Sequence, residues 1–398
     1  MADIVISQHA IVWIFLAAAA IGHFALCVFS HNWWYGQPLP RRGTDLIQII
    51  HGLALFGLPA LFWYLGGYDT LIAFNPAYSS WPAILLVGYL ALCCLVSLIV
   101  LPTVTIGRLF RPVPRALIRD HLTFVDVAAE LGHMPAGSAK ARFLARIPGN
   151  QVFKVDFAER TLQLPRLHPA WHGLTILHVS DLHFCGTPDR SFYHYVLDRC
   201  AAWEPDILAI TGDYVDSDEH RRWILPVLSR LRWREAAFAI LGNHDQWYEP
   251  PKIRRRLKRL GMRVLGNGWT EAVIRGQTMV VIGNERPWYK PETGSIGAPA
   301  ERFRLCLSHT PDNIPWARRE GIDLMLCGHV HGGQIRVPGI GSIIVPSRFG
   351  RRYDSGTFAQ GPTVMHVSRG LGAEQPLRFN CAPEVTLITL QKDALISS

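Results

Sequence analysis

Three long apolar runs crowd the first hundred residues and limit what this part of the chain can become. They span residues 11–29, 46–65 and 81–101, and short loops join them. Each approaches the roughly 20 residues that a helix needs to cross a bilayer. Buried helices of a large soluble core are the alternative, but three such runs in succession are hard to place in a soluble fold. We therefore predict a transmembrane region over residues 1–104.

Charged residues in the loops predict the orientation of these spans. Arg41 and Arg42 lie between the first two spans, whereas residues 66–80 contain one aspartate and no Lys or Arg. The third span is followed by Arg108, Arg111, Arg115 and Arg119. Because positive charge stays on the cytoplasmic side, we expect a multi-pass protein of the inner membrane, with its amino terminus outside and everything after the third span in the cytosol.

The cysteines and the charged residues agree with a cytosolic location of the part after the spans. The eight cysteines form no CxxC pair or dense framework, and reduced thiols suit the cytosol. The net charge of +9 gathers after the spans, notably in residues 221–234 and in KIRRRLKR, residues 252–259. A solvated helix face explains such a run, and attraction to anionic lipid heads, at roughly 1 kcal/mol per basic residue, is the functional alternative. No specific nucleic-acid partner is expected, because no recognisable binding module accompanies the charge.

The rest of the chain has the pattern of an α/β domain. Residues 105–150 are rich in Arg, Pro and Gly and are expected to form a cytoplasmic connector, with a short helix near 124–131. From about residue 151 short apolar runs recur, and helical patterns separate several of them, which indicates layered strands and helices. The runs are LTILHVS (174–180), DILAIT (206–211), AAFAIL (236–241), TMVVIG (278–283), RFRLCLS (302–308), IDLMLC (322–327) and TVMHVS (363–368).

Five of these runs are followed directly by residues whose side chains can bind metals. In chain order they are Asp181 and His183, then Asp213 and Asp216, then Asn243, His244 and Asp245, then His309, and finally His329 and His331. Ligands of α/β sheets lie outside the carboxyl ends of the strands, so we expect these side chains to converge. Alternate residues of an extended segment point the same way. Asp181 and His183 can therefore face one point, and so can His329 and His331.

The ligand types and their number predict the kind of metal centre. Mixed oxygen and nitrogen ligands suit Mn, Fe or Zn rather than Ca or Mg. Even seven such ligands would be too many for one tetrahedral ion. They suit two ions roughly 4 Å apart that share a carboxylate, an arrangement that activates water and clamps a phosphoryl group. We predict two divalent ions, with Mn expected and Fe or Zn as alternatives.

The ordered set of motifs resembles the calcineurin-like metallophosphoesterases over about residues 151–392. The late stretches VPSRFGRRYDSGTF (345–358) and VSRGLGAEQPLRFNCAPEVTLITL (367–390) are similar to a membrane-linked bacterial branch. That branch contains UDP-2,3-diacylglucosamine pyrophosphatases and general phosphodiesterases. The resemblance implies a four-layer α/β/β/α sandwich, preceded here by the α-helical region of three spans.

The resemblance also implies roles for individual residues. The first metal would be held by Asp181, His183 and His331. The second would be held by Asn243, His309 and His329. Asp213 would bridge the two metals. His244 would be the general acid, with Asp245 as its orienting partner, and Asn243 would also stabilise charge on the phosphoryl oxygens.

Several further residues stand beside this set. Asp216, Arg351 and Arg352 are additional candidates, the arginines for contact with a substrate phosphate. GNERPW (283–288) lacks an acidic pair that the branch has after this glycine, and Val330 stands where the branch often has Thr, so substrate choice can differ. His23 and His51 lie within the first two spans, where interhelical hydrogen bonding is expected rather than a functional role.

The sequence therefore predicts a membrane-anchored dinuclear-metal phosphoesterase with a cytoplasmic catalytic domain. Its substrate would be phosphorylated and lipid-linked, such as UDP-2,3-diacylglucosamine, and the bond cleaved would be a phosphodiester or pyrophosphate. A broad phosphodiesterase acting on soluble nucleotides is one alternative. A membrane sensor whose metal domain only binds a ligand is another. The complete ligand set together with His244 argues against the sensor, because a pure binder could lose the acid.

Overall fold

The structure, a computed structural model, describes residues 8–73, 80–290 and 297–393 of the chain. The chain divides into two compact units, Met1–Pro112 and Val113–Ser398, which we call the helical unit and the α/β unit. Each is described by itself below.

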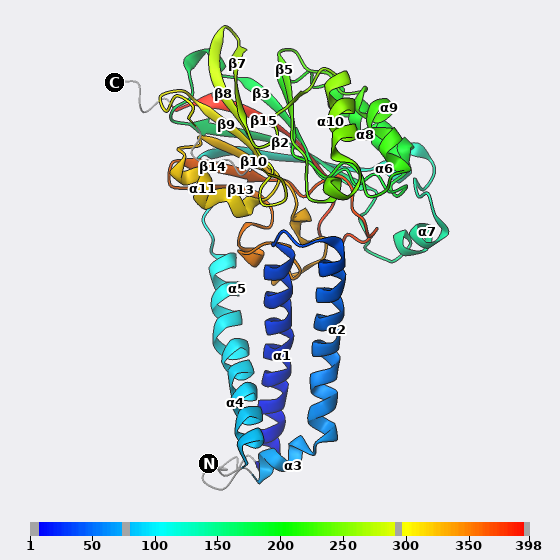
Figure 1. The fold of residues 1–398 in the computed structure, drawn as a ribbon, viewed down its shortest axis with the longest axis vertical. Coiled ribbons are helices and arrows are strands. Elements are labelled where there is room, and N and C mark those ends of the chain that lie inside the picture. Colours follow the sequence, from blue (N-terminus) through cyan, green and yellow to red (C-terminus); the bar gives the residue numbers. More distant parts are fainter. Residues whose placement is uncertain (1–7, 74–79, 291–296, 394–398) are drawn as a thin grey trace, which may run out of the picture. The chain divides into compact units, whose positions relative to one another are not determined.

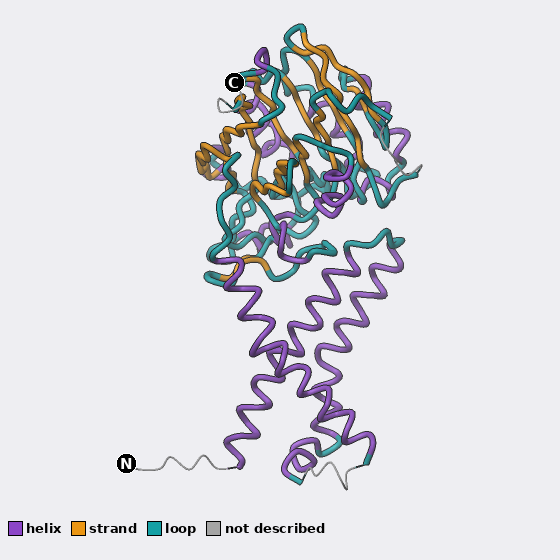
Figure 2. The backbone as a smooth tube through the Cα atoms, turned by 90° about the vertical axis from the view of Figure 1, so that its left-hand side faces the viewer, coloured by secondary structure: helices purple, strands orange, loops and turns teal. Residues whose placement is uncertain are grey.

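The helical unit contains three helices that are long and apolar enough to cross a membrane (Figure 2). They are α1 (Gln8–Tyr35), α2 (Arg41–Tyr64) and a continuous stretch formed by α4 (Trp81–Leu95), the π-helical turn η1 (Val96–Val100) and α5 (Leu101–Leu109). The short helix α3 (Gly67–Ile72) follows α2. The three apolar runs of the sequence thus form three long helices, as predicted.

Two neighbouring residues of α1 fix its packing against α4. A Cβ atom added at Gly22 would overlap the backbone of Cys93, so the helices approach closely there. His23 Nδ1 lies 2.5 Å from the hydroxyl of Tyr89, and its Nε2 lies 3.4 Å from the carbonyl oxygen of Leu55 on α2. The interhelical bonding expected at His23 is therefore confirmed. His51 instead bonds within α2.

Two sheets and a small hairpin make up the strands of the described part of the α/β unit (Figure 1). The seven-stranded sheet has the order β1 (Leu117–Asp126), β2 (Lys154–Leu164), β15 (Glu384–Lys392), β3 (Leu174–Val179), β4 (Ile207–Ile210), β5 (Ala236–Ala239) and β6 (Arg263–Val264). The six-stranded sheet has the order β13 (Gly356–Gln360), β14 (Thr363–Val367), β10 (Leu324–Cys327), β9 (Arg304–Ser308), β8 (Gln277–Asn284) and β7 (Trp269–Ile274). The hairpin pairs β11 (Arg336–Val337) with β12 (Gly341–Ser342).

These elements form four layers. Buried side chains of both sheets, such as Ile176 and Phe238 of one and Leu305 and Leu326 of the other, share one core. The outer face of the seven-stranded sheet is covered by α8 (Arg190–Ala201), α9 (Ile224–Leu228) and α10 (Pro250–Arg259). The outer face of the six-stranded sheet is covered by α11 (Ile314–Arg319). The predicted α/β/β/α sandwich is confirmed. Strands buried on both faces also explain why β4 and β10 read as unbroken apolar runs.

Two strands complete the larger sheet from distant parts of the sequence. β1 pairs antiparallel with β2, so the segment expected to be a connector includes an edge strand. The short helix expected near 124–131 begins later, as α6 (Val127–Leu131), and Asp126 caps it by accepting a hydrogen bond from the Ala129 amide at 3.2 Å. β15 lies between β2 and β3, parallel to the first and antiparallel to the second.

Candidate metal centre

Five parallel-paired strands deliver the predicted site residues at their carboxyl ends. The first three belong to the seven-stranded sheet and the last two to the six-stranded sheet. Side-chain donors form three overlapping groups, each within 4.8 Å. We call Asp181, His183 and His331 the first group, and Asp213, His309 and His329 the second group; His183, Asp213 and His244 form the third, which joins them. The convergence expected from the strand ends is therefore what the structure shows, and it joins the two sheets.

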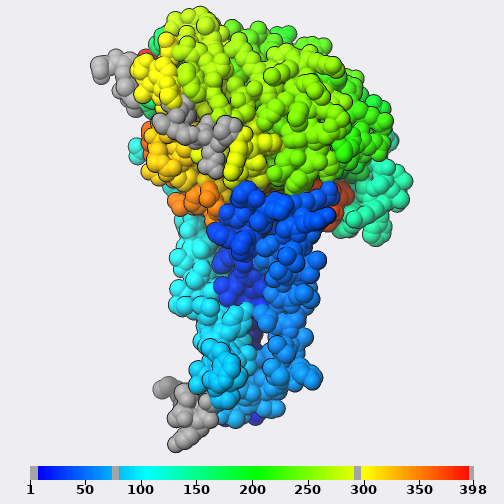
Figure 3. Space-filling view, in the orientation of Figure 1, coloured from blue at the N-terminus to red at the C-terminus, as the bar shows by residue number. Residues whose placement is uncertain are grey.

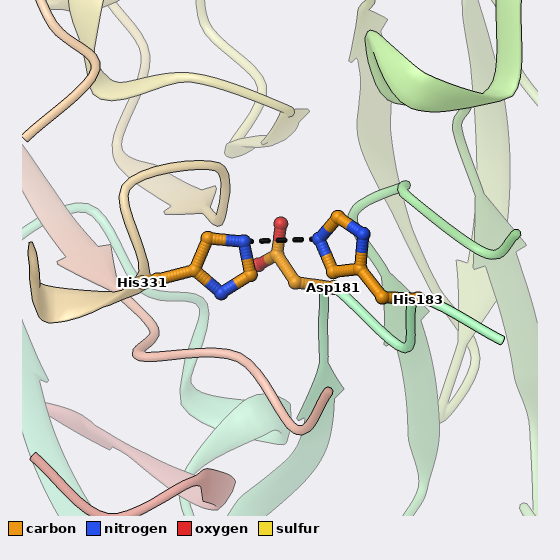
Figure 4. Close-up of side chains that lie close together, drawn as sticks. All are labelled: Asp181, His183 and His331. Carbon is orange, nitrogen blue, oxygen red and sulfur yellow. Dashed lines mark hydrogen bonds between the residues drawn. The ribbon is translucent and has the colours of Figure 1, made fainter. Parts of the chain in front are cut away.

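The first group has the geometry of a chelating site (Figure 4). His183 Nε2 and His331 Nε2 face each other at 2.9 Å. Asp181 is buried, and its Oδ2 atom has no hydrogen-bond partner among the described residues. Burial, assisted by the positive charge of His183 and Arg378, lowers the pKa of His331 well below its usual range, so its imidazole is neutral and has a lone pair to share. A cation would satisfy all three atoms at once.

The second group brings several lone pairs together in the same way. His309 Nδ1 donates to the carbonyl oxygen of Thr211 at 2.7 Å, which directs Nε2 toward Asn243 Oδ1 at 2.9 Å and Asp213 Oδ2 at 3.2 Å. His329 Nε2 is buried without a hydrogen-bond partner in the described chain. Burial lowers the pKa of His309, but the Asp213 carboxylate outweighs it and raises the pKa to about 9 when no cation is present. A divalent cation fits the place that this proton holds.

Asp213 lies between the two groups. Its Oδ2 atom is 3.6 Å from His183 Nε2 and 3.2 Å from His309 Nε2. The other carboxylate oxygen, Oδ1, accepts a hydrogen bond from the His244 amide at 2.8 Å. One carboxylate thus faces both clusters of imidazoles, which is the arrangement a bridging ligand requires.

The predicted partner of His244 is wrong. The buried Asp245 carboxylate accepts backbone hydrogen bonds from Asp213 at 3.0 Å, Tyr214 at 2.9 Å and Gly242 at 2.9 Å. It therefore ties the loop after β4 to the loop after β5. His244 Nδ1 instead lies 2.6 Å from Asp216 Oδ1.

Asp216 holds two histidines at once. Its second oxygen, Oδ2, lies 2.9 Å from His183 Nδ1, so one carboxylate orients both a predicted ligand and the predicted acid. Burial lowers the pKa of His244, but Asp216 and then Asp213 outweigh it and raise the pKa to about 10 without cations. His244 is about one-fifth exposed and is thus a protonated group within reach of solvent. The sequence signal for this pairing was the second aspartate of GDYVD.

The backbone is strained at several of the proposed metal-binding residues. Left-handed conformations occur at Asp181 (φ 54°), His183 (φ 45°), Asp213 (φ 56°), His329 (φ 73°) and His331 (φ 50°). A left-handed conformation costs free energy for a residue other than glycine, and residues in this conformation cluster at functional sites. Asp181 and His183 do fall in one group, but through left-handed turns and not through the extended segment that we expected, whereas His329 and His331 point into different groups. The nearby glycines permit close approach, because a Cβ added at Gly328 would overlap the Asp181 side chain.

Two side chains near the centre were missed from the sequence. The indole of Trp288 lies over the second group, with ring centroids 5.4 Å from His309 and 4.8 Å from His329. Arg378 is fully buried and places a guanidinium nitrogen 3.3 Å from His331 Nδ1. Its only sequence signal was a basic residue within the apolar stretch LRFNC.

The two arginines predicted to contact substrate make other contacts in this structure. Arg351 donates to the carbonyl oxygen of Ile340 at 2.8 Å, and Arg352 lies over the ring of Tyr353. Substrate contact by Arg351 and Arg352 stays a prediction.

Comparisons with known proteins agree with this centre. Residues 174–333, which contain every predicted ligand, match the family model "Calcineurin-like phosphoesterase". Phosphodiesterase YaeI of Escherichia coli (strain K12) is 34% identical over 220 residues, or 54% of this chain and 81% of that protein. The uncharacterized metallophosphoesterase YkuE of Bacillus subtilis (strain 168) is 30% identical over 251 residues, or 60% of this chain and 86% of that protein.

A third relative has a more specific name. UDP-2,3-diacylglucosamine pyrophosphatase LpxG of Chlamydia trachomatis serovar D is 25% identical over 282 residues, or 56% of this chain and 86% of that protein. The chain belongs to the calcineurin-like metallophosphoesterases. It is a hydrolase of that family, in which the relatives include a phosphodiesterase and a pyrophosphatase.

Proposed function

We propose that the chain is a membrane-anchored dinuclear-metal phosphoesterase that hydrolyses a phosphodiester or pyrophosphate bond. The observation that supports this most is the position of Asp213 Oδ2, 3.6 Å from His183 Nε2 and 3.2 Å from His309 Nε2, between the two groups of donors. Two divalent cations, with Mn expected, would supply Lewis-acid polarisation of the phosphoryl oxygens and would lower the pKa of water. The residues proposed to hold them are Asp181, His183, Asp213, Asn243, His309, His329 and His331.

The remaining side chains have roles in proton transfer and charge stabilisation. His244 engages Asp216 through Nδ1, so a proton on Nε2 is available for the departing oxygen. Asn243 turns its carbonyl oxygen toward His309, which leaves its NH₂ group to donate to a phosphoryl oxygen. Asp245 acts on the loop backbone and is a positioning residue.

The proposed substrate is lipid-linked, such as UDP-2,3-diacylglucosamine, and the α/β unit is proposed to lie in the cytoplasm. One support is the name of the LpxG relative, and another is the three apolar helices. A third is the short link between the units, because α5 ends at Leu109 and β1 begins at Leu117. The seven residues between them allow Leu109 and Leu117 to lie at most about 28 Å apart when fully extended. If the helices span a membrane, the α/β unit is confined to its surface.

A substrate panel tests this proposal. The full chain in nanodiscs, loaded with Mn(II), is given a chromogenic diester, UDP-2,3-diacylglucosamine in the bilayer, and soluble nucleotide diesters. We expect turnover of the chromogenic and lipid-linked substrates, and none by an Asp213→Asn variant. Preference for the soluble nucleotides would favour the broad phosphodiesterase, and binding without turnover of any substrate would favour the sensor.

A further inference from the structure

Two segments of the α/β unit combine exposed apolar side chains with basic residues. Residues 132–150 and 334–353 together contain seven Lys and Arg and no Asp or Glu. Their exposed apolar side chains are Phe143 (71% exposed), Ile147 (37%), Ile335 (43%), Ile340 (44%) and Ile344 (52%). Exposed apolar residues are unremarkable when they are scattered singly. These five fall on only two segments, one including α7 (Ala139–Ala145) and the other including β11 and β12.

Backbone hydrogen bonds join the two segments into one surface. Phe379 bridges to Asn150 on one side and to Ile335 on the other. The Phe379 amide donates to Gln334 at 2.9 Å, and its carbonyl oxygen accepts from the Arg336 amide at 2.9 Å. Figure 1 shows α7 and the orange segment with β11 and β12 at the same edge of the α/β unit, and Figure 3 shows both at its surface. We call residues 132–150 and 334–353 the docking rim.

The docking rim is attached directly to the metal centre. The Gln334 amide donates to the carbonyl oxygen of His331 at 3.1 Å. Arg378, next to Phe379, lies against the His331 imidazole at 3.3 Å. A surface that holds the docking rim would therefore lie close to the site where a phosphoryl group is proposed to bind.

We infer that the docking rim binds the surface of an anionic lipid bilayer, with its isoleucines and Phe143 in the interfacial region and its basic side chains against lipid phosphates. Apolar residues that enter the interface beside Lys and Arg are the pattern of interfacial binding, and basic residues near an anionic leaflet add affinity. Neither segment contains Asp or Glu, although Arg336 and Arg348 are paired with Asp354 and Asp312 outside the segments. The inference rests on the membrane attachment proposed above.

The basic helix α10 is a natural comparison, because it has charge without exposed apolar side chains. Its apolar residues Ile253 and Leu257 are buried in the core of the α/β unit. Arg254 is paired with the buried Glu285. α10 can attract an anionic surface but has nothing to insert, so it serves as the control surface.

A fluorescent probe on the docking rim tests the inference in the full chain. The background replaces the two partly exposed cysteines, as Cys27→Ser and Cys185→Ser, since the other six are buried. Single probes are then placed by Ile340→Cys on the docking rim, by Val273→Cys on β7 as an exposed control (66%) and by Leu98→Cys as a control in the proposed span. The protein is reconstituted in nanodiscs containing phosphatidylglycerol and a nitroxide-labelled lipid.

The expected result is quenching at Ile340 and Leu98 but not at Val273. Insertion about 5–10 Å into the interface should quench the Ile340 probe at least about threefold more than the Val273 probe. Quenching at Leu98 without quenching at Ile340 would overturn this inference alone. That result would also be expected if the docking rim bound a protein partner. No quenching at Leu98 would overturn the membrane attachment and this inference together.

Variants that remove single charges distinguish binding by the docking rim from a general attraction between the basic protein and an anionic bilayer. Lys140→Gln, Arg142→Gln and Arg146→Gln should each lower the docked-to-undocked ratio reported by the Ile340 probe by about fivefold. The matched changes Arg255→Gln, Lys258→Gln and Arg259→Gln on α10 should leave that ratio nearly unchanged. An equal effect of the two sets would show that net charge, and not the docking rim, holds the α/β unit at the bilayer.

Discussion

His244 Nδ1 and Asp216 Oδ1 lie 2.6 Å apart, and the other oxygen of the same carboxylate lies 2.9 Å from His183 Nδ1. One buried carboxylate therefore sets the orientation of the proposed acid and of a proposed ligand. His244 is also placed by its own backbone, because its amide donates to Asp213 at 2.8 Å. The proposed acid, the proposed ligand and the proposed bridging residue are thus linked by hydrogen bonds.

Asp216→Asn should impair catalysis without emptying the centre. The amide still fills the space, but it lacks the charge that keeps His244 protonated and oriented. We therefore expect kcat to fall by about 10- to 100-fold, which is less than the factor of about 10² to 10⁴ for complete loss of a general acid. KM should change little. The measurement is steady-state kinetics with the chromogenic diester together with metal analysis. Loss of both metals would mean that Asp216 acts through His183 and not through His244.

His244→Ala tests the acid itself. Metal content should stay near two ions per chain while the rate falls by about 10² to 10⁴. A substrate with a very good leaving group needs little protonation and should suffer less, so the ratio of rates on poor and good leaving groups is the diagnostic quantity. If that ratio equals the wild-type ratio, His244 is not the acid.

Asp213→Asn should abolish turnover and lower the metal content, because a neutral amide cannot bridge two cations as a carboxylate does. Asp218→Asn is the matched control. Asp218 is five residues away on the same loop, and its side chain is 66% exposed and paired with Arg221. Elemental analysis of both purified variants is the measurement. Two retained ions and normal activity in Asp213→Asn would remove Asp213 from the centre.

The sequence predicted the convergence of these side chains because parallel strands that are buried on both faces appear as unbroken apolar runs. β10 reads LMLC, every residue of it is buried, and the next residues are the glycine and histidines of the site. The choice between Asp216 and Asp245 as the partner of His244 was beyond the sequence. It depends on the left-handed turn at Asp213 (φ 56°), which turns the following loop back toward the β5 loop.

Contacts between residues far apart in the sequence could not be predicted either. Arg378 stands 47 residues after His331, and nothing in either local pattern links them. β1 was missed because an edge strand needs no continuous apolar face, and most residues of LIRDHLTFVD are exposed. The docking rim could not be predicted for the same reason, since its two segments are far apart in the sequence and are joined through the stretch around Phe379.

Glu384→Gln should destabilise the α/β unit. Glu384 is buried and lies 2.8 Å from Arg160 and 2.7 Å from Arg369, so its loss removes a buried partner that both cations share and leaves them with Asp120 and Asp156 respectively. Breaking such a pair costs about 3–5 kcal/mol, which should appear as a clear drop in Tm. Glu159→Gln on the same strand, β2, as Arg160 is the control and should change Tm little.

The Glu384 carboxylate also predicts that the α/β unit loses stability at acid pH. Burial raises the pKa of Glu384, but Arg160 and Arg369 outweigh it and hold the pKa well below its usual range. Because the folded-state pKa is depressed, this stabilisation is fully present above the unfolded pKa of about 4.3 and is lost as pH falls below it. Tm of the wild type should therefore decline more steeply below that pH than Tm of Glu384→Gln. Parallel declines would contradict the assignment.

The last prediction concerns the orientation of the helices. Arg41 and Arg42 lie in one loop, and residues 66–80 contain no Lys or Arg. By the positive-inside rule we predict that everything after Leu101 lies in the cytosol. A reporter enzyme that works only outside the cytosol should be silent when fused after Leu101. The same reporter placed within residues 66–80 should be active.

A charge change makes this test sharper. Arg41→Gln with Arg42→Gln removes the bias at the first loop, so a second population with the opposite orientation should become detectable, whereas Arg142→Gln, well after the spans, should have no effect. The reverse pattern in the wild type would place the metal centre outside the cytosol. The proposed substrate would then have to reach the site from the opposite leaflet, and a cytosolic nucleotide-linked lipid would no longer be its natural ligand.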